Sequence, residues 1–92
     1  MLLRDAIGFV LRRLRLEQGK TLRELADSAS VSLPYLSEIE RGRKEASSEI
    51  LGAICQVLDI TERELLLEVA NQYEQSRAVV RIRSSEQLLI AA

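Results

Sequence analysis

The sequence has no histidine, no tryptophan and a single cysteine among its 92 residues. Histidine is the commonest general base near neutral pH and the commonest metal ligand. The sequence also has no recognisable pair of catalytic acids, no metal-ligand cluster and no glycine-rich phosphate loop, so we expect no enzyme, no metal and no cofactor. Aromatic residues make up only 3% of the chain, so aliphatic side chains must build the core.

The lone cysteine excludes an internal disulfide and fits a reducing, cytoplasmic environment. Cys55 stands at helical spacing from Leu51 and Leu58, which predicts a buried core thiol, with a redox switch as the alternative. No segment approaches the roughly 20 apolar residues of a membrane span. Charged residues also interrupt any signal-peptide core near the N-terminus. These are Arg4, Asp5, Arg12 and Arg13.

The net charge of −1 hides an asymmetry between the two halves of the chain. Residues 1–44 contain nine Lys and Arg against six Asp and Glu, whereas residues 45–92 contain four Arg against eight acidic residues. This distribution suggests an anionic partner for one face only. The alternative is ordinary solvated charge scattered over the surface.

The hydrophobic pattern predicts an all-α domain of five helices, with no strand before residue 79. The first helix is expected over about 4–18, with Gly19 as its stop. Thr21 with Glu24, and later Thr61 with Glu64, form capping boxes that begin the second and fifth helices. The third helix follows Ser32 and ends at Gly42, the fourth begins at Ser47 or Ser48, and the fifth runs to about residue 77.

The second and third predicted helices are short and separated by about four residues, which is typical of a helix-turn-helix. Ala26 would be small because the two helices cross there, and Val31 would fill the turn. Leu36 and Ile39 would anchor the third helix to the core. Its outer face would then be free to enter a DNA major groove about 12 Å wide.

Residues 11–60 resemble the Cro/CI-type (XRE) helix-turn-helix domains of bacterial regulators, above all in the stretch YLSEIERG. The segment VSLPYLSEIERGRKEASSE, residues 31–49, is similar to actinobacterial regulators of Clp protease genes. The resemblance implies a Cro/CI repressor-like fold and a cytoplasmic, dimeric transcriptional regulator that binds a palindromic operator. It also suggests an activator of protease or stress genes.

The resemblance also implies roles for residues around the third helix. Base-facing residues would accept a hydrogen bond from the cytosine amino group, make apolar contact with a thymine methyl group, or form hydrogen bonds with either a base or a phosphate. They are Ser32, Leu33, Pro34, Ser37 and Glu38. Phosphate contacts would come from Arg41, Arg43, Lys44 and the Tyr35 hydroxyl. The alternatives are partial burial for Leu33, a helix start alone for Pro34, pure packing for Tyr35 and solvated charge for the three basic residues.

The resemblance further implies that Glu40 pairs with Arg15 and fixes how the recognition helix sits. Two positions depart from the family pattern. Leu22 stands where a phosphate-binding glutamine is frequent, so Arg23 would supply that contact instead. Ser30 stands where the turn usually has glycine, so a left-handed backbone there would carry strain unless local hydrogen bonds offset it.

The chain therefore divides into a DNA-binding domain at 4–60, a C-terminal helix at 61–78 and a tail at 79–92. A surplus apolar stripe on the C-terminal helix predicts a homodimer interface, and the alternative is that this helix packs on its own core. The stripe consists of Leu66, Val69, Ala70 and Tyr73. Glutamates on the same helix disfavour binding to a membrane surface.

In the tail, residues 79–83 alternate apolar and basic side chains, which favours an extended arm or a short strand. The terminal Ala91-Ala92 resembles tags that Clp-type proteases recognise, so a degradation signal is expected, with a frayed or docked end as the alternative. The expected partners are double-stranded DNA, a second copy, a Clp-type protease and, for an activator, RNA polymerase. An antitoxin-like protein-interaction module on the same scaffold is the rival hypothesis.

Overall fold

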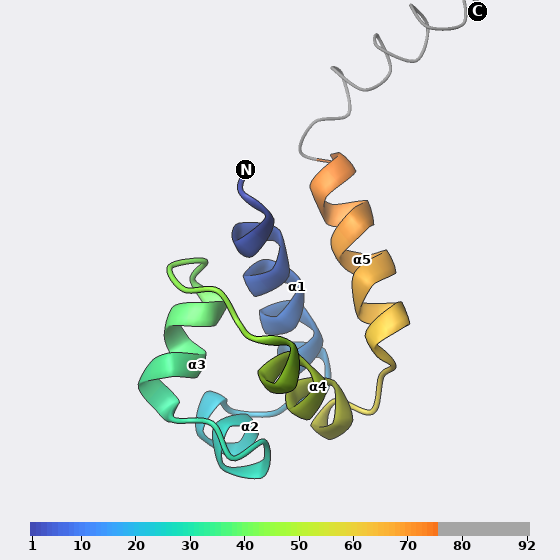
Figure 1. The fold of residues 1–92 in the computed structure, drawn as a ribbon. Helices are drawn as coiled ribbons and strands as arrows, with labels where there is room; N and C mark the ends of the chain where they lie inside the picture. The colour runs from blue at the N-terminus through green and yellow to red at the C-terminus, as the bar shows by residue number, and fades with distance from the viewer. Residues whose placement is uncertain (76–92) are drawn as a thin grey trace, which may run out of the picture.

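A computed structural model of the protein describes residues 1–75 and confirms the predicted all-α fold in five helices (Figure 1). The helices are α1 (Leu3–Glu17), α2 (Leu22–Ser28), α3 (Leu33–Glu40), α4 (Ser48–Val57) and α5 (Glu62–Gln75). Within residues 1–75 there is no strand, and no helix is long and apolar enough to cross a membrane. The predicted arm at 79–83 and the terminal Ala91-Ala92 lie outside these residues.

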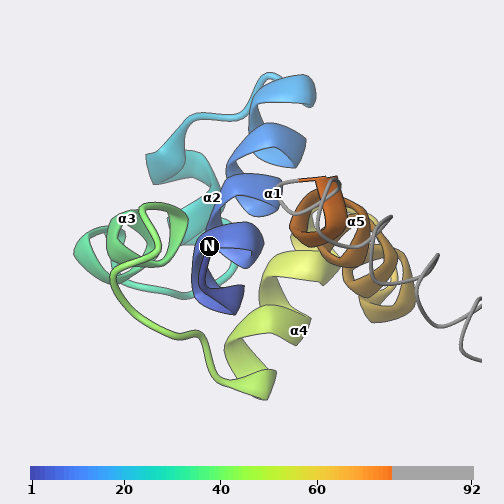
Figure 2. The same cartoon turned by 90° about the horizontal axis from the view of Figure 1, so that it is seen from above.

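Helix α1 is the centre of the arrangement. It lies between α3 on one side and α5 on the other in both views, while α2 and α4 complete the bundle (Figures 1 and 2). The buried hydrophobic side chains are aliphatic apart from Cys55, as the shortage of aromatic residues requires. Fully buried large members include Val10, Leu11, Leu25, Leu36, Ile39, Ile54 and Leu58. Because α1 is central, α3 and α5 pack against its opposite sides and are positioned by their contacts with it.

The single cysteine lies in this core. Cys55 is buried among the aliphatic side chains of α4 and its neighbours, which confirms the predicted core thiol. Burial raises the pKa of the thiol, and the nearby Glu62 carboxylate raises it further. The side chain therefore stays protonated near neutral pH and acts as a small apolar group.

The helices begin where side-chain caps are available. The Thr21 hydroxyl accepts from the Glu24 N–H at 3.0 Å, and the Glu24 carboxylate accepts from the Thr21 N–H at 2.8 Å. Thr61 and Glu64 repeat this box at 3.0 and 2.9 Å. The backbone hydrogen bond from each threonine, followed by its hydroxyl, lowers the pKa of the partner glutamate. Both predicted capping boxes are confirmed.

Helices α1 to α4 all end with one residue in the left-handed region: Gly19, Ser30, Gly42 and Asp59 have φ values of 68°, 57°, 73° and 55°. At each end the next N–H turns back to a carbonyl five residues earlier, such as Val31 to Ala26 at 2.9 Å. This is the Schellman pattern, which satisfies carbonyls that the helix leaves unpaired. The left-handed backbone expected at Ser30 before α3 is confirmed, and local hydrogen bonds of the Ser30 and Val31 N–H groups accompany it, whereas the left-handed Asp59 was not predicted.

Candidate nucleic-acid interface

The inner face of α3 is anchored to the core as the sequence predicts. Leu36 and Ile39 are buried, and so are Ala26 on α2 and Val31 in the turn. Ser32 caps α3 by accepting from the Tyr35 N–H at 3.2 Å, so Pro34 falls in the first turn, where its missing N–H costs little. The two short helices therefore form a helix-turn-helix whose second member is held on one side only.

A buried ion pair fixes α3 against α1. Arg15 Nε and Nη2 donate to the two carboxylate oxygens of Glu40 at 2.8 and 2.9 Å, and Nη1 donates to the Lys20 carbonyl at 2.9 Å. The two side chains are only 9% and 4% exposed. Hydrogen bonding to Glu40 raises the pKa of the Arg15 guanidinium. The fork-to-fork geometry restricts both distance and orientation, so the expected pair is present and determines how α3 sits.

The sequence reasoning missed a close backbone approach at Gly8. A Cβ built on Gly8 would collide with the Ile39 carbonyl oxygen and would lie 2.7 Å from that of Glu40. Only glycine lets α1 come this near to the end of α3. An isolated glycine within a helical pattern is the signal that could have indicated this contact.

The N-terminal turn of α1 also holds the loop after α3. The Arg4 Nε donates to the Gly42 carbonyl at 3.0 Å, and the Asp5 side chain fills the space where a Gly42 side chain would stand. Neither residue was predicted to have such a role. Their contacts place the basic loop relative to α1 as well as to α3.

The outer face of α3 presents the predicted base-facing residues to different extents. Ser32 and Pro34 are exposed, and Ser37 and Glu38 are half-buried. Leu33 is half-buried and packs against the core, which corresponds to the partial burial given above as its alternative. Ser32 and Pro34 are thus accessible, and Ser37 and Glu38 are accessible in part.

Tyr35 packs its ring as predicted, and its hydroxyl has a partner within the chain. Its ring is half-buried against the core, and its hydroxyl donates to the Glu45 carbonyl at 2.9 Å. A phosphate contact would require the hydroxyl to exchange this carbonyl for a phosphate oxygen, so the predicted contact stays a prediction. Tyr35 ties α3 to the loop that follows it.

The predicted phosphate-binding residues are exposed. Arg41, Arg43 and Lys44 follow the end of α3 and Arg23 lies on α2. None of these four forms an ion pair with another residue of the described part, 1–75. They are therefore positive charges available for an anionic partner.

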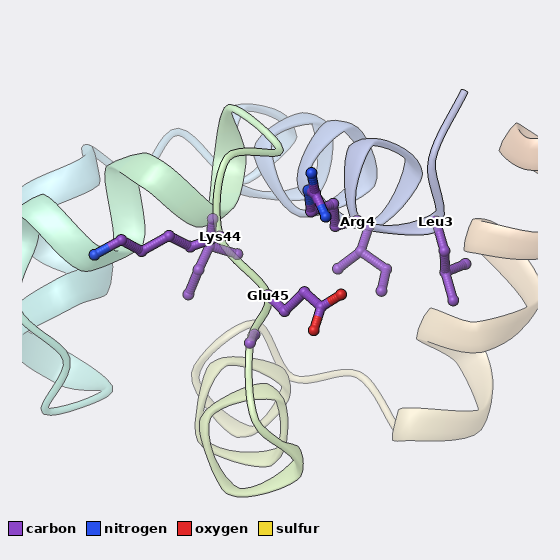
Figure 3. A pocket seen from close by; sticks show the side chains of 7 residues that line it. Leu3, Arg4, Lys44 and Glu45 are labelled. Carbon is purple, nitrogen blue, oxygen red and sulfur yellow. The ribbon is translucent and has the colours of Figure 1, made fainter.

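A cleft lies behind this loop, between the start of α1 and the segment that leads into α4. Its floor is apolar, formed by Ile7, Ile39 and Ala46. Figure 3 shows the Lys44 side chain extending away toward α3, while the Glu45 carboxylate points across the cleft on the α1 side. Lys44 thus places its positive charge on the α3 side of the loop, and Glu45 places its negative charge on the other side.

The four residues predicted for the dimer interface separate into two groups. Val69 is only 4% exposed and Tyr73 is half-buried, and both pack on the core of their own chain. Leu66 is 63% exposed, and Ala70 is exposed beside it. Leu67, which was not predicted, is 54% exposed. Helix α5 therefore folds back on its own core through one side and leaves a different apolar side uncovered.

Comparisons with known proteins agree with this geometry. A helix-turn-helix family model matches residues 11–65. The transcriptional regulator ClgR of Mycobacterium tuberculosis is 50% identical over 80 residues, covering 87% of this chain and 71% of the relative. SinR of Bacillus subtilis is 40% identical over 63 residues, covering 67% of this chain and 57% of that protein.

Solved structures give the same result. The clp gene regulator ClgR from Corynebacterium glutamicum matches with a TM-score of 0.79 and 44% identity, covering 95% of this chain and 94% of that one. The restriction-modification controller protein C.AhdI from Aeromonas hydrophila matches with a TM-score of 0.66 and 31% identity, over 67% and 94% of the two chains. The chain therefore belongs to the XRE-type helix-turn-helix family of transcriptional regulators.

Proposed function

We propose that the protein binds an operator sequence in double-stranded DNA by inserting α3 into the major groove. The observation that carries this proposal is the one-sided anchoring of α3. Leu36, Ile39 and Glu40 are buried, whereas the opposite face and the basic loop beyond Gly42 are open. A helix held in this way can enter a groove without losing the contacts that orient it.

Base contacts would come from Ser32, Pro34, Ser37 and Glu38, with Leu33 contributing through its exposed part. Glu38 can accept from a cytosine amino group, and Pro34 can touch a thymine methyl. Phosphate contacts would come from Arg23, Arg41, Arg43 and Lys44. These residues carry no sequence information themselves, but they fix the position of the protein on the duplex.

Two substitutions test this division of roles. Arg41→Ala should weaken binding to all sequences alike and reduce the salt slope by about 1. Glu38→Ala should change the preference at one base pair, where a bidentate or charged contact is worth about 1–3 kcal/mol. Binding-site selection followed by titration measures both effects. A reversed pattern would refute the roles, and weak, sequence-blind binding by the unmodified protein would favour an antitoxin-like interaction module.

We further propose that the protein binds a palindromic operator as a homodimer through the exposed side of α5. Leu66, Leu67 and Ala70 form an apolar surface that the chain itself leaves uncovered. Helix-turn-helix dimers read half-sites about 34 Å apart. A related restriction-modification controller protein was solved as a tetramer in complex with its natural 35 base-pair operator, with a TM-score of 0.72 and 25% identity to this chain.

Sedimentation measurements test the interface. Replacing Leu66 and Leu67 together with Gln should raise the dimer dissociation constant at least tenfold, because burying one leucine contributes about 1.5–3 kcal/mol. Leu16→Gln is a matched control, since Leu16 is 53% exposed on α1. If Leu16→Gln became monomeric while the Leu66/Leu67 double variant remained a dimer, the interface would lie on α1 instead.

The regulated genes are proposed from similarity. Because the relatives with 44–50% identity are described as clp gene regulators, we propose that this protein activates protease genes and contacts RNA polymerase at the promoter. Loss of clp transcript induction in a deletion strain is the expected result.

The C-terminal Ala91-Ala92 is proposed as a degradation signal. Replacing Ala91-Ala92 with Asp-Asp should lengthen the cellular half-life if a Clp-type protease recognises that end.

A further inference from the structure

A positively charged hollow lies beside the outer face of α3. Its polar walls come from three parts of the chain: Arg12 and Arg15 from α1, Ser37 and Glu40 from α3, and Arg41 and Arg43 from the residues that follow. Arg12 was given no role by the sequence motif or by the family resemblance. Its presence in the same hollow as two predicted phosphate contacts is the starting observation.

The hollow has more positive than negative charge. Four guanidinium groups face a single carboxylate, and that carboxylate is already bonded through both oxygens to Arg15. Arg12, Arg41 and Arg43 are exposed and form no ion pair within residues 1–75. Three like charges around one hollow repel one another, so an anion that enters is attracted by all three.

We propose that this hollow holds one phosphate of the DNA backbone and that Arg12 is a direct phosphate contact. The proposal rests on the proposed function, because Ser37 belongs to both the hollow and the outer face of α3 and Arg41 directly follows that helix. A duplex placed on that face brings a backbone strand to the hollow. A planar guanidinium can bind two oxygens of a phosphate at once.

The start of α2 offers no hydrogen-bond donor to this hollow. Leu22 forms the remaining wall of the hollow, and its aliphatic side chain offers no hydrogen bond. Arg23, which the sequence suggested as a substitute, is exposed on α2 and is not among the residues that line the hollow. Arg12 therefore adds a donor from α1 to those of Arg41 and Arg43 at this phosphate, whereas Arg23 would contact a different phosphate.

The salt dependence of operator binding tests the proposal. Arg12→Gln should weaken binding about tenfold per half-site, and the slope of log K against log salt should fall by about 0.9 for each protomer bound. Arg63→Gln is the matched control, because Arg63 is an exposed arginine on α5 with no ion pair among the described residues. It should leave the slope unchanged, whereas Arg12→Lys should keep most of it.

Neutral phosphates locate the contact. Methylphosphonate linkages placed one at a time along the operator should reveal one position per half-site that weakens the unmodified protein but not Arg12→Gln. Thermal unfolding of Arg12→Gln should match the unmodified protein, which separates lost contact from lost fold. Equal slopes for Arg12→Gln and the unmodified protein would overturn the role of Arg12, whereas absence of DNA binding by the unmodified protein would overturn the proposed function itself.

Discussion

The two sides of α1 are packed in different ways. On the α3 side, a bidentate ion pair between Arg15 and Glu40 is almost fully buried, and the backbone of α3 touches α1 at Gly8. On the α5 side, Leu65 and Val69 supply aliphatic contact. The only cross-helix ion pair there, within residues 1–75, joins Arg13 to Glu68 at 2.7 Å with side chains 35% and 46% exposed.

This difference corresponds to what each helix must do. Hydrogen bonds weaken steeply when their angles change, whereas apolar burial has no preferred direction. The α3 side therefore fixes an orientation, which a groove-binding helix needs. The α5 side gives cohesion without fixing one orientation, and α5 is the helix proposed to contact a second copy through its exposed side.

Removing one partner of each ion pair should give the largest contrast. Glu40→Ala should lower the free energy of unfolding by about 3–5 kcal/mol, because it leaves the Arg15 charge buried and unpaired. Glu68→Ala should cost less than about 1 kcal/mol, since its pair is half-exposed and solvent screens it. Urea denaturation measures both values, and equal losses would contradict the distinction between the two sides.

The double variant Arg15→Met with Glu40→Leu sharpens the same comparison. Replacing a buried pair by apolar groups of similar size is often neutral for stability, so much of the loss should be recovered. The operator affinity of the double variant should nevertheless be lower than that of the unmodified protein, because the apolar pair does not impose the orientation of α3. Full recovery of both would show that the pair contributes stability alone.

Two glycines on helices provide the next contrast. Gly8→Ala should destabilise the protein by about 1–3 kcal/mol, because the new methyl group meets backbone carbonyl oxygens of α3 that cannot rotate away. Gly52→Ala on α4 should be neutral or stabilising by up to about 1 kcal/mol. There the new methyl group would meet only a Glu62 carboxylate oxygen at 3.3 Å. Thermal unfolding distinguishes these outcomes.

The capping boxes should give the smallest effects and show a pH dependence. Thr21→Ala and Thr61→Ala should each cost about 1 kcal/mol at pH 7. Folding lowers the pKa of Glu24 and Glu64. Their ionised carboxylates therefore contribute to the free energy of unfolding above the unfolded-state pKa near 4.3, and this contribution is lost as the pH falls through the lower folded-state pKa. Each variant should therefore lose less stability between pH 6 and pH 3 than the unmodified protein, as measured by urea titrations.

Much of the fold followed from local chemistry. Capping threonines and serines, Pro34 and the helix-ending glycines act within a few residues of themselves, so they indicated the helix boundaries correctly. The pairing of Arg15 with Glu40 came from the family resemblance, because 25 residues separate the two along the chain. Gly8 was missed because its role depends on a backbone that only packing brings close.

The candidate site also has features that the sequence predicts and features that depend on the tertiary structure. Its basic loop is evident from Arg41, Arg43 and Lys44 alone. The position of Tyr35 is not, because a half-buried tyrosine can turn its hydroxyl to a phosphate or to a carbonyl, and only the path of the loop offers Glu45. Likewise, the stripe of Val69 and Tyr73 shows that α5 buries one side, but not whether a partner or the chain's own core covers it.

The sequence by itself determined the five helices, the helix-turn-helix and the sign of its charge, because caps, periodicity and composition are local properties. The tertiary structure decided that α1 reaches α3 through Gly8 and Arg15, that α5 turns Val69 inward and Leu66 outward, and that Arg12 joins the basic surface. Each of these depends on which distant segments share a surface, and side chains that far apart in the chain interact only after the core has closed.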